Sequence, residues 1–231
     1  MPLHGGELVL VRHGESTANA AGIGQGRAEF PLSDLGRRQA MRTADHLATL
    51  GPFDALYASP QQRAAETAGA IGDRLGLMPH LDADLVEIDI GVMSGSSWTE
   101  LEASQPDVMA RYRQAEAERP HPRNRELIPG WEPIPAVVTR VWRAVAAALG
   151  NHPGGRVIVV AHGGVINAFL THLLAGDARE VLWQHPSPNC AVSRITLDPA
   201  GPVAVCLTDD AHLAADRGSH TIFDAPKDQA L

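Results

Sequence analysis

The sequence predicts an α/β protein, a three-layer sandwich whose mostly parallel central sheet is covered by helices on both faces. Short apolar runs alternate with longer stretches that carry an apolar stripe at helical spacing, and this alternation is typical of such sheets. The chain has 231 residues, enough for one large domain, and no repeat or linker-like segment divides it. We therefore expect one domain that is interrupted by a cap insertion of helices and loops.

The first half of the chain is expected to form two strands, each followed by a helix. Residues 8–12 and 54–58 are apolar runs of strand length. Ser33 is a suitable cap for the helix that follows the first run. After the second run, Ser59 would cap the next helix and Pro60 would be its first residue, because proline is favoured at that position.

The second half is expected to contribute two helices and three strands. A helix over residues 137–149 precedes a buried strand over residues 156–161. Another helix with an apolar stripe follows residues 163–164. Residues 190–197 and 203–208 have the pattern of a hairpin that closes the sheet.

The composition limits the classes of partner. Hydrophobic residues make up 44% of the chain and the net charge is −8, so a basic face for nucleic acid is not expected. No apolar run approaches the roughly 20 residues that cross a bilayer, and the N-terminus lacks the features of a secretory signal. Cys190 and Cys206 form no metal-ligand spacing, and each is expected as a small core residue in a strand. We expect a cytoplasmic protein that binds neither nucleic acid nor membranes.

Reactive residues lie at or just after the ends of three expected strands. Arg12 and His13 end the first, and His162 ends the third. Arg63 follows the second strand, and if Pro60 begins the helix, its side chain leans back toward the strand ends. Because the carboxyl ends of parallel strands meet at one edge of a sheet, these four side chains should converge in one crevice.

Such a cluster suits a tetrahedral dianion such as a phosphoryl group. Guanidinium groups match its oxygens, and the glycines after both histidines let backbone N–H groups approach it. A metal fits poorly, because Arg12 repels a cation beside His13. The same positive surroundings should lower the pKa of His13 and keep its imidazole neutral near pH 7. We therefore expect no metal and no cofactor.

Nine short motifs occur in a fixed order along the chain. They are LVLVRHGES at residues 8–16, QG at 25–26, PLSDLGRRQA at 31–40, YASP at 57–60, Arg63, ETA at 66–68, LVEIDIG at 85–91, VVAHGG at 159–164 and DAHL at 210–213. Together they resemble the histidine phosphatase superfamily, also called phosphoglycerate mutase-like proteins. One Arg-His-Gly tripeptide would be weak evidence, whereas this ordered set covers nearly the whole chain.

The resemblance implies a role for each matching residue. His13 would be the nucleophile, phosphorylated during turnover, and Glu87 would be the proton donor. The groups expected to contact the phosphoryl oxygens are Arg12, Asn19, Ser16, Arg63, His162 and Gly163. Phosphoryl transfer is catalysed mainly by positioning and charge neutralisation, which side-chain cations can supply without a metal.

Residues 92–135 interrupt the alternation and are expected to form the cap over the crevice. They include the basic run 119–125, which either contacts substrate or is a solvated loop. Both ends of the segment depart from the family pattern, so the sequence does not identify the organic part of the substrate. The domain would span residues 1–213, with a tail over 214–231.

The expected function is metal-independent hydrolysis of a small phosphorylated metabolite through a phosphohistidine intermediate. A phosphoglycerate-type mutase and a non-catalytic phosphate-binding scaffold are the alternatives. Family mutases carry a more specific set of basic residues in the cap, which this chain does not match, so a phosphatase is favoured. The small substrate is the expected partner, and a homodimer is left open.

Overall fold

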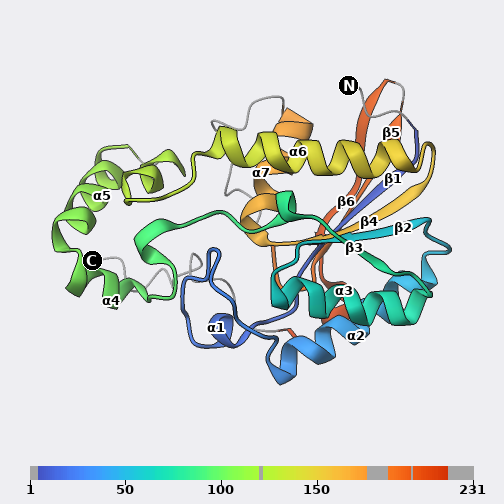
Figure 1. Ribbon diagram of the computed structural model, residues 1–231, viewed down its shortest axis with the longest axis horizontal. Helices are drawn as coiled ribbons and strands as arrows, with labels where there is room; N and C mark the ends of the chain where they lie inside the picture. The colour runs from blue at the N-terminus through green and yellow to red at the C-terminus, as the bar shows by residue number, and fades with distance from the viewer. Residues whose placement is uncertain (1–4, 120–121, 176–186, 199, 218–231) are drawn as a thin grey trace.

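The structure, a computed structural model, describes residues 5–119, 122–198 except 176–186, and 200–217. Its centre is a six-stranded sheet with the strand order β3-β2-β4-β1-β5-β6 (Figure 1). The strands are β1 (Glu7–Arg12), β2 (Ala55–Ala58), β3 (Pro79–Leu81), β4 (Arg156–Ala161), β5 (Val192–Asp198) and β6 (Gly201–Asp209). The first four are mutually parallel, and β5 and β6 form an antiparallel hairpin beside β1. The expected mostly parallel sheet is confirmed.

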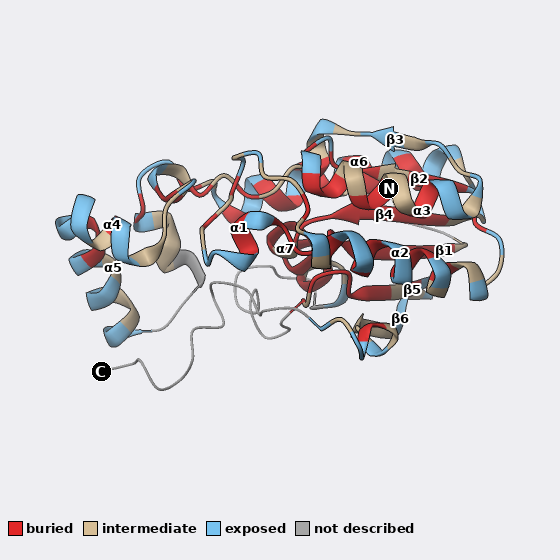
Figure 2. Ribbon diagram, turned by 90° about the horizontal axis from the view of Figure 1, so that it is seen from below, coloured by how far each residue is buried: buried red, intermediate tan, exposed pale blue. Residues whose placement is uncertain are grey.

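Helices cover both faces of this sheet, as expected for a three-layer sandwich. They are α1 (Thr17–Ala20), α2 (Asp34–Thr49), α3 (Gln62–Leu75), α4 (Trp98–Ser104), α5 (Pro106–Glu118), α6 (Ile134–Asn151) and α7 (Gly163–Ala175). Alternate residues of β1 divide the core: Leu8 and Leu10 pack with α6 and α7, whereas Val9 and Val11 pack with α2 and α3. Figure 1 shows the sheet between these two helical layers, and Figure 2 shows β1 and β4 coloured as buried.

The register of the parallel strands aligns the ends that carry the reactive residues. Arg12 at the end of β1 lies opposite Ala161 at the end of β4. Ala58 at the end of β2 lies opposite Val160, one residue earlier in β4. The loops after β1, β2 and β4 therefore start side by side at one edge of the sheet.

Helix α3 begins later than the sequence predicts. Its first residue is Gln62 and its cap position is Gln61, so the expectation that Pro60 is the first helical residue is wrong. The hydroxyl of Ser59 accepts from the N–H of Gln61 at 3.3 Å and lies 2.8 Å from Nε2 of His162. The helix does not start at Pro60 because the backbone of Gln61 is extended, with φ and ψ of −62° and 135°.

The expectation that both cysteines are core residues in strands is also wrong. Cys190 is buried, but it lies in the turn before β5 with a φ of 58°. Its N–H donates to the carbonyls of Arg12 and His13, at 3.1 and 3.2 Å, so this turn wraps over the end of β1. Cys206 does lie in β6, but it is only half-buried.

Helices α4 and α5 form a lobe beyond the carboxyl ends of the parallel strands, on the same side of the sheet as α1 (Figure 1). A capping box of Ser97 and Glu100 starts α4, and the rings of Trp98 and Tyr112 stack at 5.6 Å to join the two helices. A 3₁₀ helix (Pro122–Leu127) returns the chain toward α6. Among the residues that the structure describes, no helix is both long and apolar enough to cross a membrane.

Only the start of the expected tail lies within the described residues, and it is attached to the sandwich. Asp216 forms ion pairs with Arg38 and Arg42 of α2, and its carbonyl accepts from Gln39 Nε2 at 3.0 Å. Residues 218–231 lie outside the described part.

Candidate active site

Strands β1 and β4 place two histidines next to each other. His13 follows β1 and His162 follows β4, and their ring centroids are 5.1 Å apart. The backbone N–H of His13 donates to the carbonyl of Ala161 at 3.0 Å, which extends the strand pairing by one residue. Both side chains are buried. The expected convergence of these distant histidines is confirmed.

The surroundings of His13 define which ring nitrogen can react. Nδ1 lies 2.7 Å from the carbonyl oxygen of Gly14. Because a carbonyl can only accept, Nδ1 carries the proton and Nε2 keeps its lone pair. Burial, together with the guanidinium charges of Arg63 and Arg12, holds the pKa of His13 well below its usual value. The imidazole is therefore neutral at pH 7, which is the form that can act as a nucleophile.

His162 is held by the end of β2. Its Nε2 lies 2.8 Å from the hydroxyl of Ser59, while its buried Nδ1 has no hydrogen-bond partner among the described residues. Burial lowers the pKa of His162 well below its usual value, and the charge of Arg63 lowers it further. A bound dianion would offset both effects, so His162 can gain a proton when an anion enters the crevice.

Arg63 reaches the crevice from the first turn of α3. Its Nη1 and Nη2 donate to the carbonyls of Ala28 and Gly26, at 3.0 and 2.9 Å, and its buried Nε has no hydrogen-bond partner in the described part of the chain. Burial lowers the pKa of Arg63, against the opposing negative charges of Glu87 and Glu29. The remaining N–H at Nε is a donor suited to a phosphoryl oxygen.

Arg12 lies across the crevice and is also buried. Its Nη1 donates to the carbonyl of Ser187. A Cβ atom built on Gly163, the first residue of α7, would lie 3.4 Å from Arg12 Nε. This is an ordinary contact distance, so the guanidinium group of Arg12 lies directly beside the start of α7.

Asn19 and Ser16 form one hydrogen-bonded unit in α1. The side-chain oxygen of Asn19 accepts from the N–H of Ser16 and from Asn189 Nδ2, both at 3.2 Å. The amide nitrogen of Asn19 is thus the end left to donate to a ligand. Ser16 is fully buried, and its hydroxyl accepts from the N–H of Asn19 and lies 2.7 Å from Gln25 Oε1. The structure gives Ser16 a supporting contact to Asn19, and its contact with substrate stays a prediction.

Glu87 places its carboxyl group at the N-terminus of α7, next to His162. The two carboxylate oxygens accept from the backbone N–H groups of Gly164 and Val165, each at 3.2 Å. A Cβ atom on Gly164 would lie only 2.7 Å from Glu87 Oε1, so glycine is needed for this approach. The charge of Glu87 reaches Arg63, which places the carboxyl group beside the phosphate-binding cluster.

Sequence analysis missed several residues that hold these groups in place. Arg140 of α6 donates to the carbonyls of Asp84, Val86 and Glu87 and pairs with Glu132 at 2.9 Å. A charged residue inside the apolar stripe of α6 is the signal that could have identified it. The other missed residues are Gln61 and Asn189, and their sequence neighbourhoods carry no such signal.

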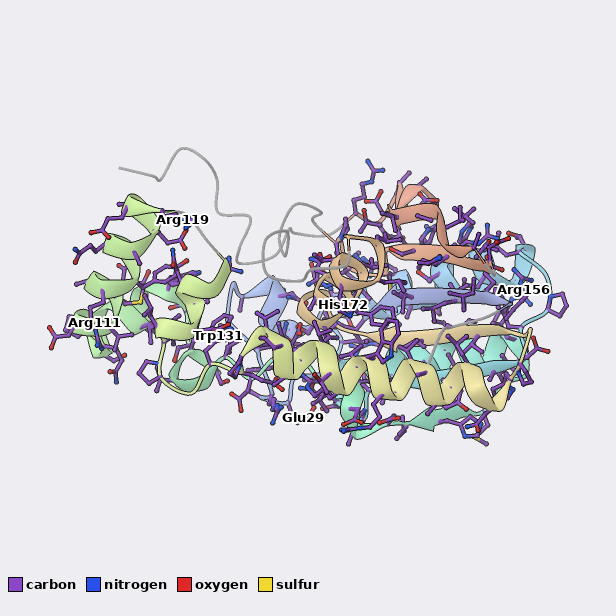
Figure 3. All side chains as sticks on the ribbon, turned by 90° about the horizontal axis from the view of Figure 1, so that it is seen from above. Glu29, Arg111, Arg119, Trp131, Arg156 and His172 are labelled. Carbon is purple, nitrogen blue, oxygen red and sulfur yellow. The ribbon has the colours of Figure 1, made fainter. Side chains whose placement is uncertain are left out.

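The basic run 119–125 contributes no described contact to the crevice. Asn124 donates to Glu116 at 2.8 Å, and Arg125 is hydrogen-bonded to Tyr112, so both side chains pack against α5. Arg119 is exposed on the outside of the lobe (Figure 3). Part of the run lies outside the described residues.

No group of three or more His, Cys, Asp or Glu side chains that could hold a metal ion occurs within the residues that the structure describes. The cluster consists instead of two imidazoles, two guanidinium groups, an amide and a carboxyl group near the carboxyl ends of β1, β2 and β4. Fixed cations of this kind bind and neutralise a phosphoryl group. The site can therefore position a phosphoryl group beside a nucleophilic imidazole nitrogen.

Comparison with known proteins agrees with this arrangement. The chain belongs to the histidine phosphatase superfamily (branch 1), whose family model matches residues 8–210. It is similar to the metal-independent phosphoserine phosphatase of Arabidopsis thaliana, with 31% identity over 90% of this chain and 84% of that protein. It is also similar to the glucosyl-3-phosphoglycerate phosphatase of Mycolicibacterium vanbaalenii, with 34% identity over 72% of this chain and 73% of that protein.

Two further similarities complete the comparison. Phosphoglycerate mutase-like protein 4 of Arabidopsis thaliana is 33% identical over 70% of this chain and 68% of that protein. Among solved structures, Bacillus stearothermophilus YhfR has a TM-score of 0.76 and 27% identity, and the match covers 90% of this chain and 99% of that one.

Proposed function

We propose that this chain is a metal-independent phosphatase that hydrolyses phosphomonoesters of small metabolites through a phosphohistidine at His13. The observation that carries the proposal is the state of the His13 ring. Its Nδ1 is anchored at 2.7 Å to the Gly14 carbonyl, and its burial beside Arg12 and Arg63 keeps the imidazole neutral. Nε2 therefore offers a lone pair where the phosphoryl group would be bound.

The reaction takes place in two steps. In the first, Nε2 of His13 attacks phosphorus, the N–P bond forms and the P–O bond to the alcohol breaks. The leaving oxygen takes a proton from the Glu87 carboxyl group. In the second, Glu87 accepts a proton from a water molecule that attacks phosphohistidine, and the N–P bond breaks to release phosphate. Arg12, Arg63 and His162 neutralise the charge on the phosphoryl oxygens in both steps.

The names of the relatives support a small phosphorylated metabolite as the substrate class. Two of them are named for phosphoserine and for glucosyl-3-phosphoglycerate, which are both small phosphomonoesters. The similarity to a phosphoglycerate mutase-like protein keeps a mutase as the second candidate, because a mutase uses the same phosphoenzyme and returns the phosphoryl group to substrate.

Release of inorganic phosphate tests the proposal. The purified chain is incubated with phosphoserine, glucosyl-3-phosphoglycerate, 3-phosphoglycerate and p-nitrophenyl phosphate, and free phosphate and isomerised products are both measured. A phosphatase releases phosphate in proportion to substrate consumed. Isomerisation without phosphate release supports the mutase instead, and neither product from any ester supports a non-catalytic scaffold.

Three finer expectations from the sequence stay predictions. They are a domain over residues 1–213 with a cap over 92–135, a cytoplasmic location, and self-association as a homodimer. Limited proteolysis, cell fractionation and sedimentation equilibrium test them in turn.

A further inference from the structure

Gln61 is buried between Glu87 and Arg63, whose relative position matters for the proposed reaction. The residue is 3% exposed and lies between β2 and α3. Its Oε1 accepts from the backbone N–H of Glu87 at 2.7 Å, and its Nε2 donates to the carbonyl of Gly26 at 3.1 Å. The primary amide of Gln61 provides the acceptor and the donor at once.

The Gly26 carbonyl also holds the phosphate-binding arginine. It accepts from Nη2 of Arg63 at 2.9 Å, so Gln61 and Arg63 share one acceptor. Gly26 has a φ of 49°, and a Cβ atom there would lie 2.6 Å from Ile90 Cγ1. The carbonyl that joins Gln61 to Arg63 is therefore fixed by close packing against the segment that carries Glu87.

The other hydrogen bonds of Glu87 do not reach Arg63. Its carbonyl accepts from Arg140 Nη2 at 3.2 Å, and its carboxylate oxygens accept from the start of α7. Among the hydrogen bonds of the described residues, only those of Gln61 connect the backbone of Glu87 to the Gly26 carbonyl that holds Arg63.

Helix capping does not explain this side chain. Gln61 occupies the cap position of α3, but its side chain makes no hydrogen bond to the helix end. It is turned away toward Glu87 and Gly26. A buried amide whose two ends are both hydrogen-bonded outside its own helix holds together the segments that carry Glu87 and Gly26.

We propose that Gln61 is a positioning residue that sets the proton donor Glu87 against the phosphate-binding Arg63. The inference rests on the proposed function, in which Glu87 protonates the leaving oxygen. Loss of the Gln61 bridge leaves Arg63 with its own bond to Gly26 but removes the hydrogen bond that holds the backbone N–H of Glu87. The step that needs the proton donor is then impaired, whereas phosphoryl binding is retained.

Single-turnover phosphorylation of His13 by two esters tests this role. An alkyl phosphate needs protonation of its leaving group, whereas p-nitrophenyl phosphate needs little. Gln61→Met removes both hydrogen bonds at nearly constant length and should slow the alkyl ester about 10-fold or more, since small misplacements of reacting groups have effects of this size. The rate with p-nitrophenyl phosphate should be unchanged. The matched control is Gln62→Met, at an exposed neighbour whose side chain contacts only Glu66 in the described hydrogen bonds, and it should leave both rates unchanged.

Coupling to Glu87 separates a positioning role from a structural one. In the Glu87→Gln background, Gln61→Met should cause no further slowing with the alkyl ester, because the group that it positions no longer donates a proton. Equal slowing of both esters, or additive slowing in the double variant, overturns the inference. Gln61→Asn, whose amide is one methylene too short for the bridge, should repeat the selective loss and takes the place of Gln61→Met if that variant does not fold.

Failure of the proposed function gives a different result. Wild-type protein would then form no phosphohistidine with either ester, or Glu87→Gln would slow both esters equally.

Discussion

The close approach of Glu87 to α7 makes Gly164→Ala an informative perturbation. A Cβ atom at this position would lie 2.7 Å from Glu87 Oε1 and 2.8 Å from Ile88 Cδ1. Ordinary contact begins at 3.4 Å, so the carboxyl oxygen must move by about 0.7 Å. The movement stretches the 3.2 Å hydrogen bond from the N–H of Val165 to Oε1 and disturbs the bond of equal length from the N–H of Gly164 to Oε2.

The expected effect falls on the step that needs a proton donor. A displacement approaching 1 Å can reduce the rate of a positioned reaction by about 10- to 100-fold. The phosphorylation of His13 by an alkyl phosphate should slow by this factor, whereas p-nitrophenyl phosphate should react at nearly the wild-type rate. Added volume in a packed site should also lower the free energy of unfolding by about 1–3 kcal/mol.

The assay is single-turnover phosphorylation with both esters, together with urea unfolding. Gly69→Ala in α3 is the matched control, because a Cβ atom there meets nothing within 4 Å. It should leave both rates unchanged and, as a helix-interior replacement, stabilise the protein by about 0.5–1 kcal/mol. A wild-type rate for Gly164→Ala with the alkyl ester would refute the placement of the proton donor at the start of α7.

Three other predictions follow from the site. Glu87→Gln should slow the phosphorylation of His13 by the alkyl ester and spare that by p-nitrophenyl phosphate, whereas Arg63→Ala should slow both reactions about 100-fold or more. Equal slowing of the two reactions in Glu87→Gln would exclude Glu87 as the acid. Activity should survive exhaustive treatment with EDTA, and a loss that zinc or magnesium restores would show a metal requirement. The free energy of unfolding, measured in urea, should fall as the pH drops below about 6.5. Burial lowers the pKa values of His13 and His162, and that of His212 to about 4, so the unfolded chain binds more protons than the folded one. An unfolding free energy that stays constant between about pH 7 and 5 would contradict this.

Local patterns were sufficient to predict the sheet and the pairing of the two histidines. The apolar runs at β1 and β4 define two neighbouring parallel strands, and each is followed at once by its histidine. Since strand ends are aligned by backbone pairing, the meeting of His13 and His162 follows from the strands alone. The direction of the Arg63 side chain was predicted although its helix starts later than expected, because the residue still lies in the first turn of α3.

The supporting residues could not be predicted, because their partners are distant in sequence. Ser59 has the local pattern of a helix cap, yet its hydroxyl lies beside His162, 103 residues away. Asn189 donates to the carbonyl of His13 across 176 residues. Ser59 keeps a local hydrogen bond from the N–H of Gln61 at 3.3 Å, but the contacts that support the two histidines are tertiary. Such choices depend on packing, which a single sequence does not display.

Direct detection of the phosphoenzyme tests whether His13 is the residue that is phosphorylated during turnover. Protein mixed with a reactive substrate is denatured in alkali, which preserves phosphohistidine, and the modified residue and ring nitrogen are identified by peptide mass spectrometry and ³¹P NMR. The account predicts phosphate on Nε2 of His13, no labelling and no turnover in His13→Ala, and normal labelling in the control His172→Ala on α7 (Figure 3). Substantial phosphate release by His13→Ala, or phosphate on Nδ1 of His13, would contradict it.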